Sequence, residues 1–122
     1  MADYDPSMID RYTDYRRFIA DALVSMGASR ALFAREVGLS EAMVSQVLAG
    51  KRRLRPALLG AVAGFFHLGE DERLVLGALL DLENDSERAR ATAWATLRAR
   101  RRFLDRDPEA EAAYPLTGVP SA

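Results

Sequence analysis

Apolar residues recur three and four positions apart along most of the chain, which is the period of helices that bury one face. The first such stripe runs from Tyr12 to Met26 and predicts a helix over Ile9–Met26, ended by Gly27. No segment shows the alternation of apolar and polar positions, rich in β-branched residues, that marks a half-buried strand. The pattern therefore predicts an all-α fold.

Two short helices are predicted after the first. Each begins after a serine, a residue type that caps helix N-termini, and ends before a glycine, which adopts the left-handed conformation that stops a helix. These segments with their flanking residues are Ser29, Arg30–Val37 and Gly38, and then Ser40, Glu41–Ala49 and Gly50.

The second half of the chain predicts three longer helices, over Pro56–Phe66, Glu70–Leu82 and Glu87–Leu104. The middle one is apolar almost all round, so we expect it at the centre of the bundle or at a subunit interface. From residue 107 the chain contains three prolines and a glycine, and we expect an irregular tail over residues 107–122.

The composition removes several kinds of chemistry. The chain has no cysteine, which excludes disulfides, thiol nucleophiles and cysteine-ligated metal sites. A Ser-His-Asp triad would have to use the single histidine, His67. The group His67, Glu70 and Asp71 fits a turn at a helix end better than a metal site, so we expect no enzyme, no metal and no cofactor.

No apolar run is long enough to span a membrane, and the acidic N-terminus lacks a signal-peptide pattern, which favours a cytoplasmic protein.

The net charge of −1 hides a strongly uneven distribution. Residues 29–55 carry six cations against two acids, a net charge of +4, and residues 88–106 carry seven against one, a net charge of +6. The intervening residues 56–87 carry one arginine against seven acids, a net charge of −6. Such runs are usually solvated helix faces, but two basic blocks are also the pattern of a surface that binds a polyanion.

The two short helices with their tight turn at Gly38 have the layout of a helix-turn-helix. Ala34 is small at the expected crossing of the two helices, and Val44 should face the same core. The later helix of this pair, Glu41–Ala49, has short or amide-bearing residues on its outward side, which fit a major groove but also occur on any exposed helix. These residues are Glu41, Ala42, Ser45 and Gln46.

The sequence here resembles the Cro/repressor-type (XRE-like) helix-turn-helix family of bacterial and phage regulators. The resemblance covers about residues 13–69, and its two matching stretches are residues 33–40, Phe-Ala-Arg-Glu-Val-Gly-Leu-Ser, and residues 44–52, Val-Ser-Gln-Val-Leu-Ala-Gly-Lys-Arg. The helix after Pro56 also matches. A leader such as Tyr12–Phe18 and an Arg-rich helix such as Leu97–Leu104 resemble a narrower group of bacterial regulators. The resemblance implies double-stranded DNA as the partner and a location at the nucleoid.

The resemblance also implies roles for individual residues. Gln46 is the strongest candidate for a base contact, because its amide can pair with adenine through two hydrogen bonds. Glu41 departs from many relatives, which have a neutral or basic residue there, and its carboxylate would weaken binding near phosphates. The base-reading positions are Ser40, Glu41, Ala42, Ser45 and Gln46, and the phosphate-binding positions are Arg30, Lys51, Arg52, Arg53 and Arg55.

A second basic face is predicted on the last helix. At 100° per residue, four arginines fall within about 80° of one another, whereas Trp94, Leu97 and Leu104 occupy a different sector that should pack. The arginines form either a solvated face or a surface for phosphate or for an acidic partner, which could be the acidic segment from Glu70 to Glu87. They are Arg88, Arg98, Arg102 and Arg106.

These observations favour a sequence-specific DNA-binding transcriptional regulator that acts as a homodimer, since one such motif reads only a few base pairs. The alternative is a protein-interaction module, or an antitoxin-like partner protein, that uses the helix-turn-helix as a scaffold. We expect four parts: a leader with the first helix (1–28), the helix-turn-helix core (29–69), C-terminal helices offering a dimerisation surface (70–106), and the tail (107–122).

Overall fold

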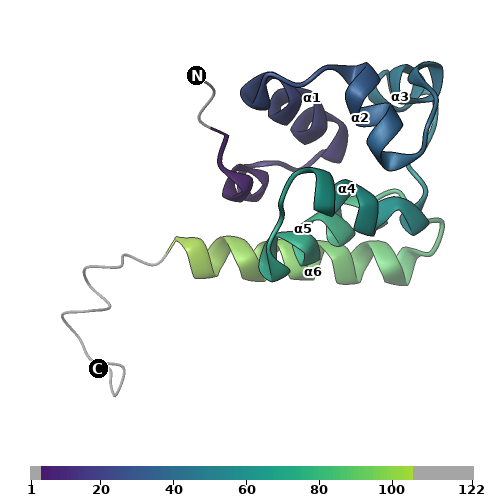
Figure 1. Ribbon diagram of the computed structural model, residues 1–122. Coiled ribbons are helices and arrows are strands. Elements are labelled where there is room, and N and C mark those ends of the chain that lie inside the picture. Colours follow the sequence, from purple (N-terminus) through teal and green to yellow (C-terminus); the bar gives the residue numbers. More distant parts are fainter. Residues whose placement is uncertain (1–3, 106–122) are drawn as a thin grey trace, which may run out of the picture.

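The computed structural model describes residues 4–105, which fold into helices without a strand in that range. This confirms the all-α prediction. In order, the elements are η1 (Pro6–Arg11), α1 (Tyr15–Met26), α2 (Arg30–Val37), α3 (Glu41–Leu48), η2 (Pro56–Leu58), α4 (Leu59–Phe65), α5 (Glu70–Asp81) and α6 (Glu87–Leu104), where η marks a 3₁₀-helix (Figure 1).

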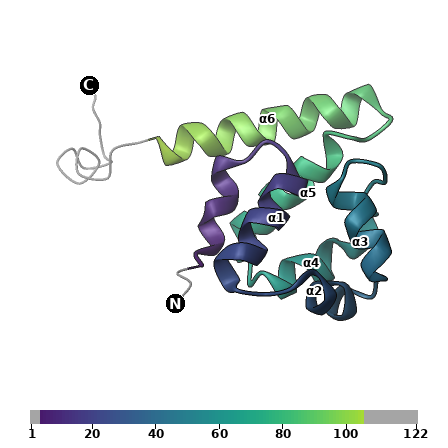
Figure 2. The ribbon, with the colours of Figure 1, turned by 90° about the horizontal axis from the view of Figure 1, so that it is seen from above.

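The helices surround one core, with α5 beneath α4 and α6 along the outer edge (Figure 1). Seen from above, α6 lies at one side of the molecule and α2 at the other (Figure 2). Three phenylalanines, from α1, from α2 and from the C-cap of α4, meet in the core: the ring of Phe66 lies 5.2 Å from that of Phe18 and 5.5 Å from that of Phe33. Their near-complete burial fixes α1 and α2 against the end of α4.

The predicted caps form. Ser29 and Ser40 each accept a hydrogen bond from the backbone N–H three residues later, at 3.0 and 3.1 Å. Gly38 has φ +81°, a left-handed conformation that costs little only for glycine. The predicted bounds of the second helix and of the last helix, Glu87–Leu104, are therefore confirmed, and the third helix ends one residue early, at Leu48.

The single helix predicted over Ile9–Met26 is wrong. The chain forms η1, then an extended segment, and only then α1. The break comes at Asp14, whose backbone is extended and whose carboxylate accepts the N–H of Arg16 at 2.9 Å, as an N-cap does. The apolar stripe crosses the break, with Tyr12 before it and Tyr15 after it, and Ile9 of η1 is fully buried as well. The helix expected from Pro56 likewise starts as the 3₁₀ turn η2.

Helix α5 is central, the first of the two places expected for it. Most of its apolar side chains are buried inside the chain, where Leu76 and Leu79 are at most 1% exposed, and Leu74 is the exception at 64%. On α6, by contrast, only Ala93 is buried. Leu97 packs against the core, but the expected packing of Trp94 and Leu104 is incomplete, since these side chains are 43% and 40% exposed. The two side chains lie beside the face of α6 that packs against the bundle, not within it.

No helix within residues 4–105 combines the length and the apolar character needed to cross a bilayer. The expected tail, residues 107–122, and Arg106 lie outside the described residues.

Candidate nucleic-acid interface

Helices α2 and α3 form a compact pair around the turn at Gly38. The N–H of Leu39 donates to the carbonyl oxygen of Ala34 at 2.8 Å, which closes the end of α2. Ala34 and Val44 are 3% and 1% exposed, as expected for the residues at the crossing of the two helices. The buried side of α3 is completed by Val47, so the orientation of its opposite side is fixed by packing.

The outward side of α3 is open to solvent. Every residue assigned to base reading is exposed, as the spacing predicts. Ser40 also serves as the N-cap of α3, so its hydroxyl is already engaged with the N–H of Met43. Glu41 follows in the first turn, where the helix dipole favours a carboxylate. The exposed set is Ser40, Glu41, Ala42, Ser45 and Gln46.

Exposed cations precede and follow α3 along the chain. Arg30 is exposed at the first position of α2, and the loop that follows α3, residues 49–55, carries four exposed cations. We call this segment the basic loop. Leu54, 4% exposed, anchors the loop to the core. Among the described residues, the side chains of Arg30, Lys51 and Arg55 have no hydrogen-bond or ion-pair partner, which leaves them available to an anion.

Two other cations of the basic loop are engaged within the chain. The Nε–H of Arg52 donates to Oε1 of Gln46 at 2.9 Å, so the residue assigned to phosphate orients the residue assigned to base reading. Arg53 forms an ion pair with Asp85 at 3.1 Å, both side chains being well exposed. The five predicted phosphate-binding residues are therefore not equivalent.

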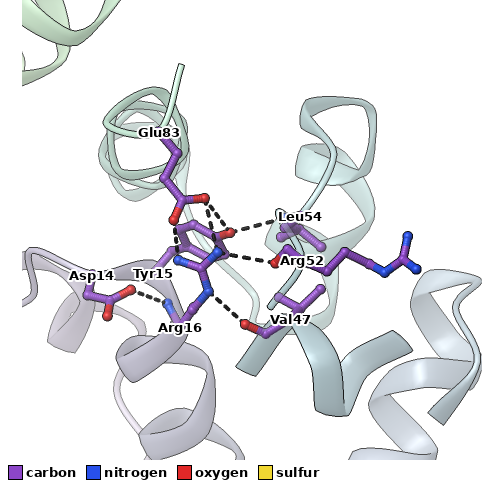
Figure 3. Close-up of polar contacts among 7 residues, drawn as sticks. All are labelled: Asp14, Tyr15, Arg16, Val47, Arg52, Leu54 and Glu83. Atoms are coloured by element: carbon purple, nitrogen blue, oxygen red, sulfur yellow. Dashed lines mark hydrogen bonds and ion pairs between the residues drawn. The ribbon is translucent and has the colours of Figure 1, made fainter. Parts of the chain in front are cut away.

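A polar cluster that the sequence analysis missed holds the basic loop in place (Figure 3). It consists of Tyr15 and Arg16 at the start of α1 and Glu83 in the turn between α5 and α6. The Arg16 guanidinium contacts both carboxylate oxygens of Glu83. It also donates to the carbonyl oxygens of Val47, at 2.6 Å, and Arg52, at 3.1 Å. Arg16 thus connects the end of α3 and the basic loop to the α5–α6 turn, which is distant in the sequence.

Tyr15 completes the cluster. Its hydroxyl donates to Oε1 of Glu83 at 2.8 Å and accepts the N–H of Leu54 at 3.0 Å. Burial raises the pKa of the Tyr15 phenol to about 12, so the phenol stays protonated and able to donate at neutral pH. Burial alone also raises the pKa of Glu83, but the hydrogen bonds from Arg16 and Tyr15 outweigh it, and this pKa lies below its ordinary value.

The second basic face is reproduced in part. Arg88, Arg98 and Arg102 are exposed on α6, while Arg106 lies outside the described residues.

Within the described range, no group of three or more histidine, cysteine, aspartate or glutamate side chains could hold a metal ion.

Comparison of the chain with protein-family models, with curated proteins and with solved structures found no match. The geometry of α2, α3 and the basic loop is therefore the basis for proposing a function.

Proposed function

We propose that the protein is a sequence-specific DNA-binding transcriptional regulator that acts as a homodimer. The observation that carries this proposal is the exposed polar side of α3, opposite a buried side, together with exposed cations at Arg30, Lys51 and Arg55 whose side chains have no partner within residues 4–105. A helix of this kind can enter a major groove, while cations at both of its flanks reach the phosphates on either side.

The contacts within the site assign different tasks to its residues. Gln46 is the longest neutral side chain on the outward side of α3, so it is our candidate for reading a base. The cluster of Tyr15, Arg16 and Glu83 ties the basic loop to the end of α3, next to Gln46. Preorganisation of this kind lowers the ordering cost of binding.

The dimer part of the proposal needs a surface other than the buried side of α5. Leu74 is 64% exposed on α5 and Trp94 is 43% exposed on α6. The two residues are equally distant from Asn84 in the α5–α6 turn, so an antiparallel hairpin brings them to the same level. Sedimentation of Leu74→Asp tests this surface, since a charge in the interface should shift a dimer to monomer.

The primary experiment is selection of duplexes from a random pool, followed by anisotropy titration at a fixed salt concentration. We expect one enriched motif, and weaker binding by Arg30→Ala and Lys51→Ala. A protein that enriches no motif and binds no duplex at 50 mM salt would disprove the proposal.

The second candidate is a protein-interaction module, or an antitoxin-like partner protein, built on the same scaffold. Glu41 favours it, because an exposed carboxylate at the start of α3 would repel phosphate. Glu41→Gln separates the two candidates: it should strengthen DNA binding if α3 enters a groove, and leave duplex binding absent if the protein is only an interaction module.

A further inference from the structure

The arginines of α6 divide into two sets with different surroundings. Those that face the bundle have partners inside the chain. Arg100 makes two hydrogen bonds to the Asp10 carboxylate, at 3.0 and 3.2 Å, and lies 3.6 Å from the Asp71 carboxylate. Arg101 donates to the carbonyl oxygen of Asp10, and Arg90 to that of Asn84. The fold accounts for all three.

The fold does not account for the other set, Arg88, Arg98 and Arg102. Their side chains are exposed and have no hydrogen-bond or ion-pair partner among the described residues. At 100° per residue they lie within about 80° of one another and span about 21 Å along the axis. Arg88 is the second residue of α6, where the helix dipole disfavours a cation. Its position is therefore not explained by helix stability.

A row of small residues runs between these three arginines. Ala91, Ala95 and Ala99 repeat every four residues, and all three are exposed. They share the direction of the arginines, away from the buried Ala93. We call the two rows together the outer face of α6. Alanines in this arrangement leave a shallow seam in which a second helix can approach closely, with the guanidinium groups on either side.

We propose that the outer face of α6 binds an acidic helical segment of a partner protein. Charge complementarity identifies the occupant, because between Arg88 and Arg102 the outer face carries three cations and no acid. A second copy of α6 does not fit: antiparallel pairing about Ala95 would place Arg88 opposite Arg102, and parallel pairing would place each arginine beside itself. The proposal does not depend on DNA binding by α3.

A nucleic acid explains the surface less well. Phosphate contacts require cations but not a seam of alanines, and α6 lies on a different side of the molecule from α2 and α3 in both views (Figures 1 and 2). A helical partner should carry carboxylates near the three arginines, about ten and fourteen residues apart, with small side chains between them. Such a helix needs at least about 14 residues to cover the 21 Å span.

The test uses the full chain and a labelled, alanine-based 21-residue peptide with three pairs of glutamates at these spacings. Anisotropy should report binding of the glutamate peptide and none of a matched lysine peptide. The double variant Arg98→Glu/Arg102→Glu should lose on the order of tenfold in affinity, because like charges facing each other across an interface are strongly unfavourable. Arg73→Glu, an exposed change of the same sign on α5, should bind as the parent does.

A second variant tests the seam itself. Ala95→Gln is neutral and favours a helix, but it adds bulk between the arginines, so peptide affinity should fall several-fold while the circular dichroism spectrum is unchanged. Binding of the glutamate peptide that is indifferent to all α6 variants would overturn the proposal. A second result would also overturn it: a scrambled 20-base-pair duplex binds more tightly than the peptide, and this binding is weakened by Arg98→Glu/Arg102→Glu but not by Ala95→Gln. The outer face would then be a nucleic-acid surface.

Discussion

At the scale of single residues, the contact between Gln46 and Arg52 changes what each can do. The Nε–H of Arg52 donates to the Gln46 amide oxygen at 2.9 Å. Under the proposed function, Arg52 would therefore position the residue that reads a base as well as contact phosphate. A bidentate contact of Gln46 with adenine would leave this oxygen shared between Arg52 and the base.

We therefore predict that Gln46 and Arg52 are energetically coupled in DNA binding. Gln46→Ala should cost about 1–3 kcal/mol on the preferred site and flatten the preference at one base pair. Arg52→Ala should weaken all sequences and also reduce that preference, because Gln46 loses its support. A double-mutant cycle, measured by anisotropy on the preferred and a scrambled duplex, should give a non-additive result. The coupling is contradicted if the effects of the two substitutions add and Arg52→Ala weakens both duplexes equally.

Glu83 has a second testable consequence at this scale. Its pKa is lower in the folded protein than its ordinary value of about 4.3. The ionised carboxylate therefore stabilises the fold above the ordinary pKa, and this contribution is lost as pH falls through the lowered folded pKa.

We predict that Glu83→Gln lowers the free energy of unfolding by about 1–3 kcal/mol at pH 7. This is the range for a hydrogen bond to a charged group, with its lower end extended because the Glu83 side chain is 29% exposed and solvent weakens the interaction. Urea titrations should show a constant difference from the parent down to about pH 5 and a shrinking one below about pH 4.3. Glu36→Gln, a change at a more exposed carboxylate, is the control and should show almost no difference. An equally large loss at pH 3 would mean that the charge of Glu83 is not what stabilises.

At the scale of elements, the boundaries set by local chemistry could be predicted and the others could not. Ser29, Ser40 and Gly38 act on their own helix ends, so the sequence alone located α2 and the start of α3. The break before α1 was missed because the apolar stripe has Tyr12 before the break and Tyr15 after it, which hides the cap at Asp14.

Glycines provide a matched test of this local control. Gly38 has φ +81°, whereas Gly60 lies in α4 with ordinary helical geometry and no atom within 4 Å of an added Cβ. Gly38→Ala should destabilise by about 1–2 kcal/mol, the cost of a left-handed alanine. Gly60→Ala should stabilise by up to about 1 kcal/mol, because alanine is the better helix former. Thermal or urea unfolding measures the change in stability of each variant. The two changes have opposite signs if the turn at Gly38 is as described, and the same sign if it is not.

At the scale of the whole molecule, the parts of the site that sequence reasoning missed are the long-range ones. The exposed side of α3 follows from helical period, and its residues were all located correctly. The cluster that holds the basic loop joins Arg16 to Glu83, 67 positions apart, and the Arg53–Asp85 pair spans 32. No local pattern distinguishes those acids from their solvated neighbours, since only the packing of α5 and α6 brings them to the loop.

The Arg53–Asp85 pair leads to the last prediction, because in the proposed complex with DNA an acid of the α5–α6 turn would compete with phosphate for a cation of the basic loop. Both side chains are well exposed, so the pair is weak and can exchange partners. Asp85→Asn should release Arg53 and tighten binding to a scrambled duplex about two- to fivefold. One additional phosphate contact should also steepen the plot of log affinity against log salt by about 0.9. Asp81→Asn removes the same charge from the end of α5 and controls for the change in net charge. If both variants tighten binding equally and leave the slope unchanged, Arg53 does not reach phosphate, and the slope must come from the contacts expected of the other four cations, Arg30, Lys51, Arg52 and Arg55.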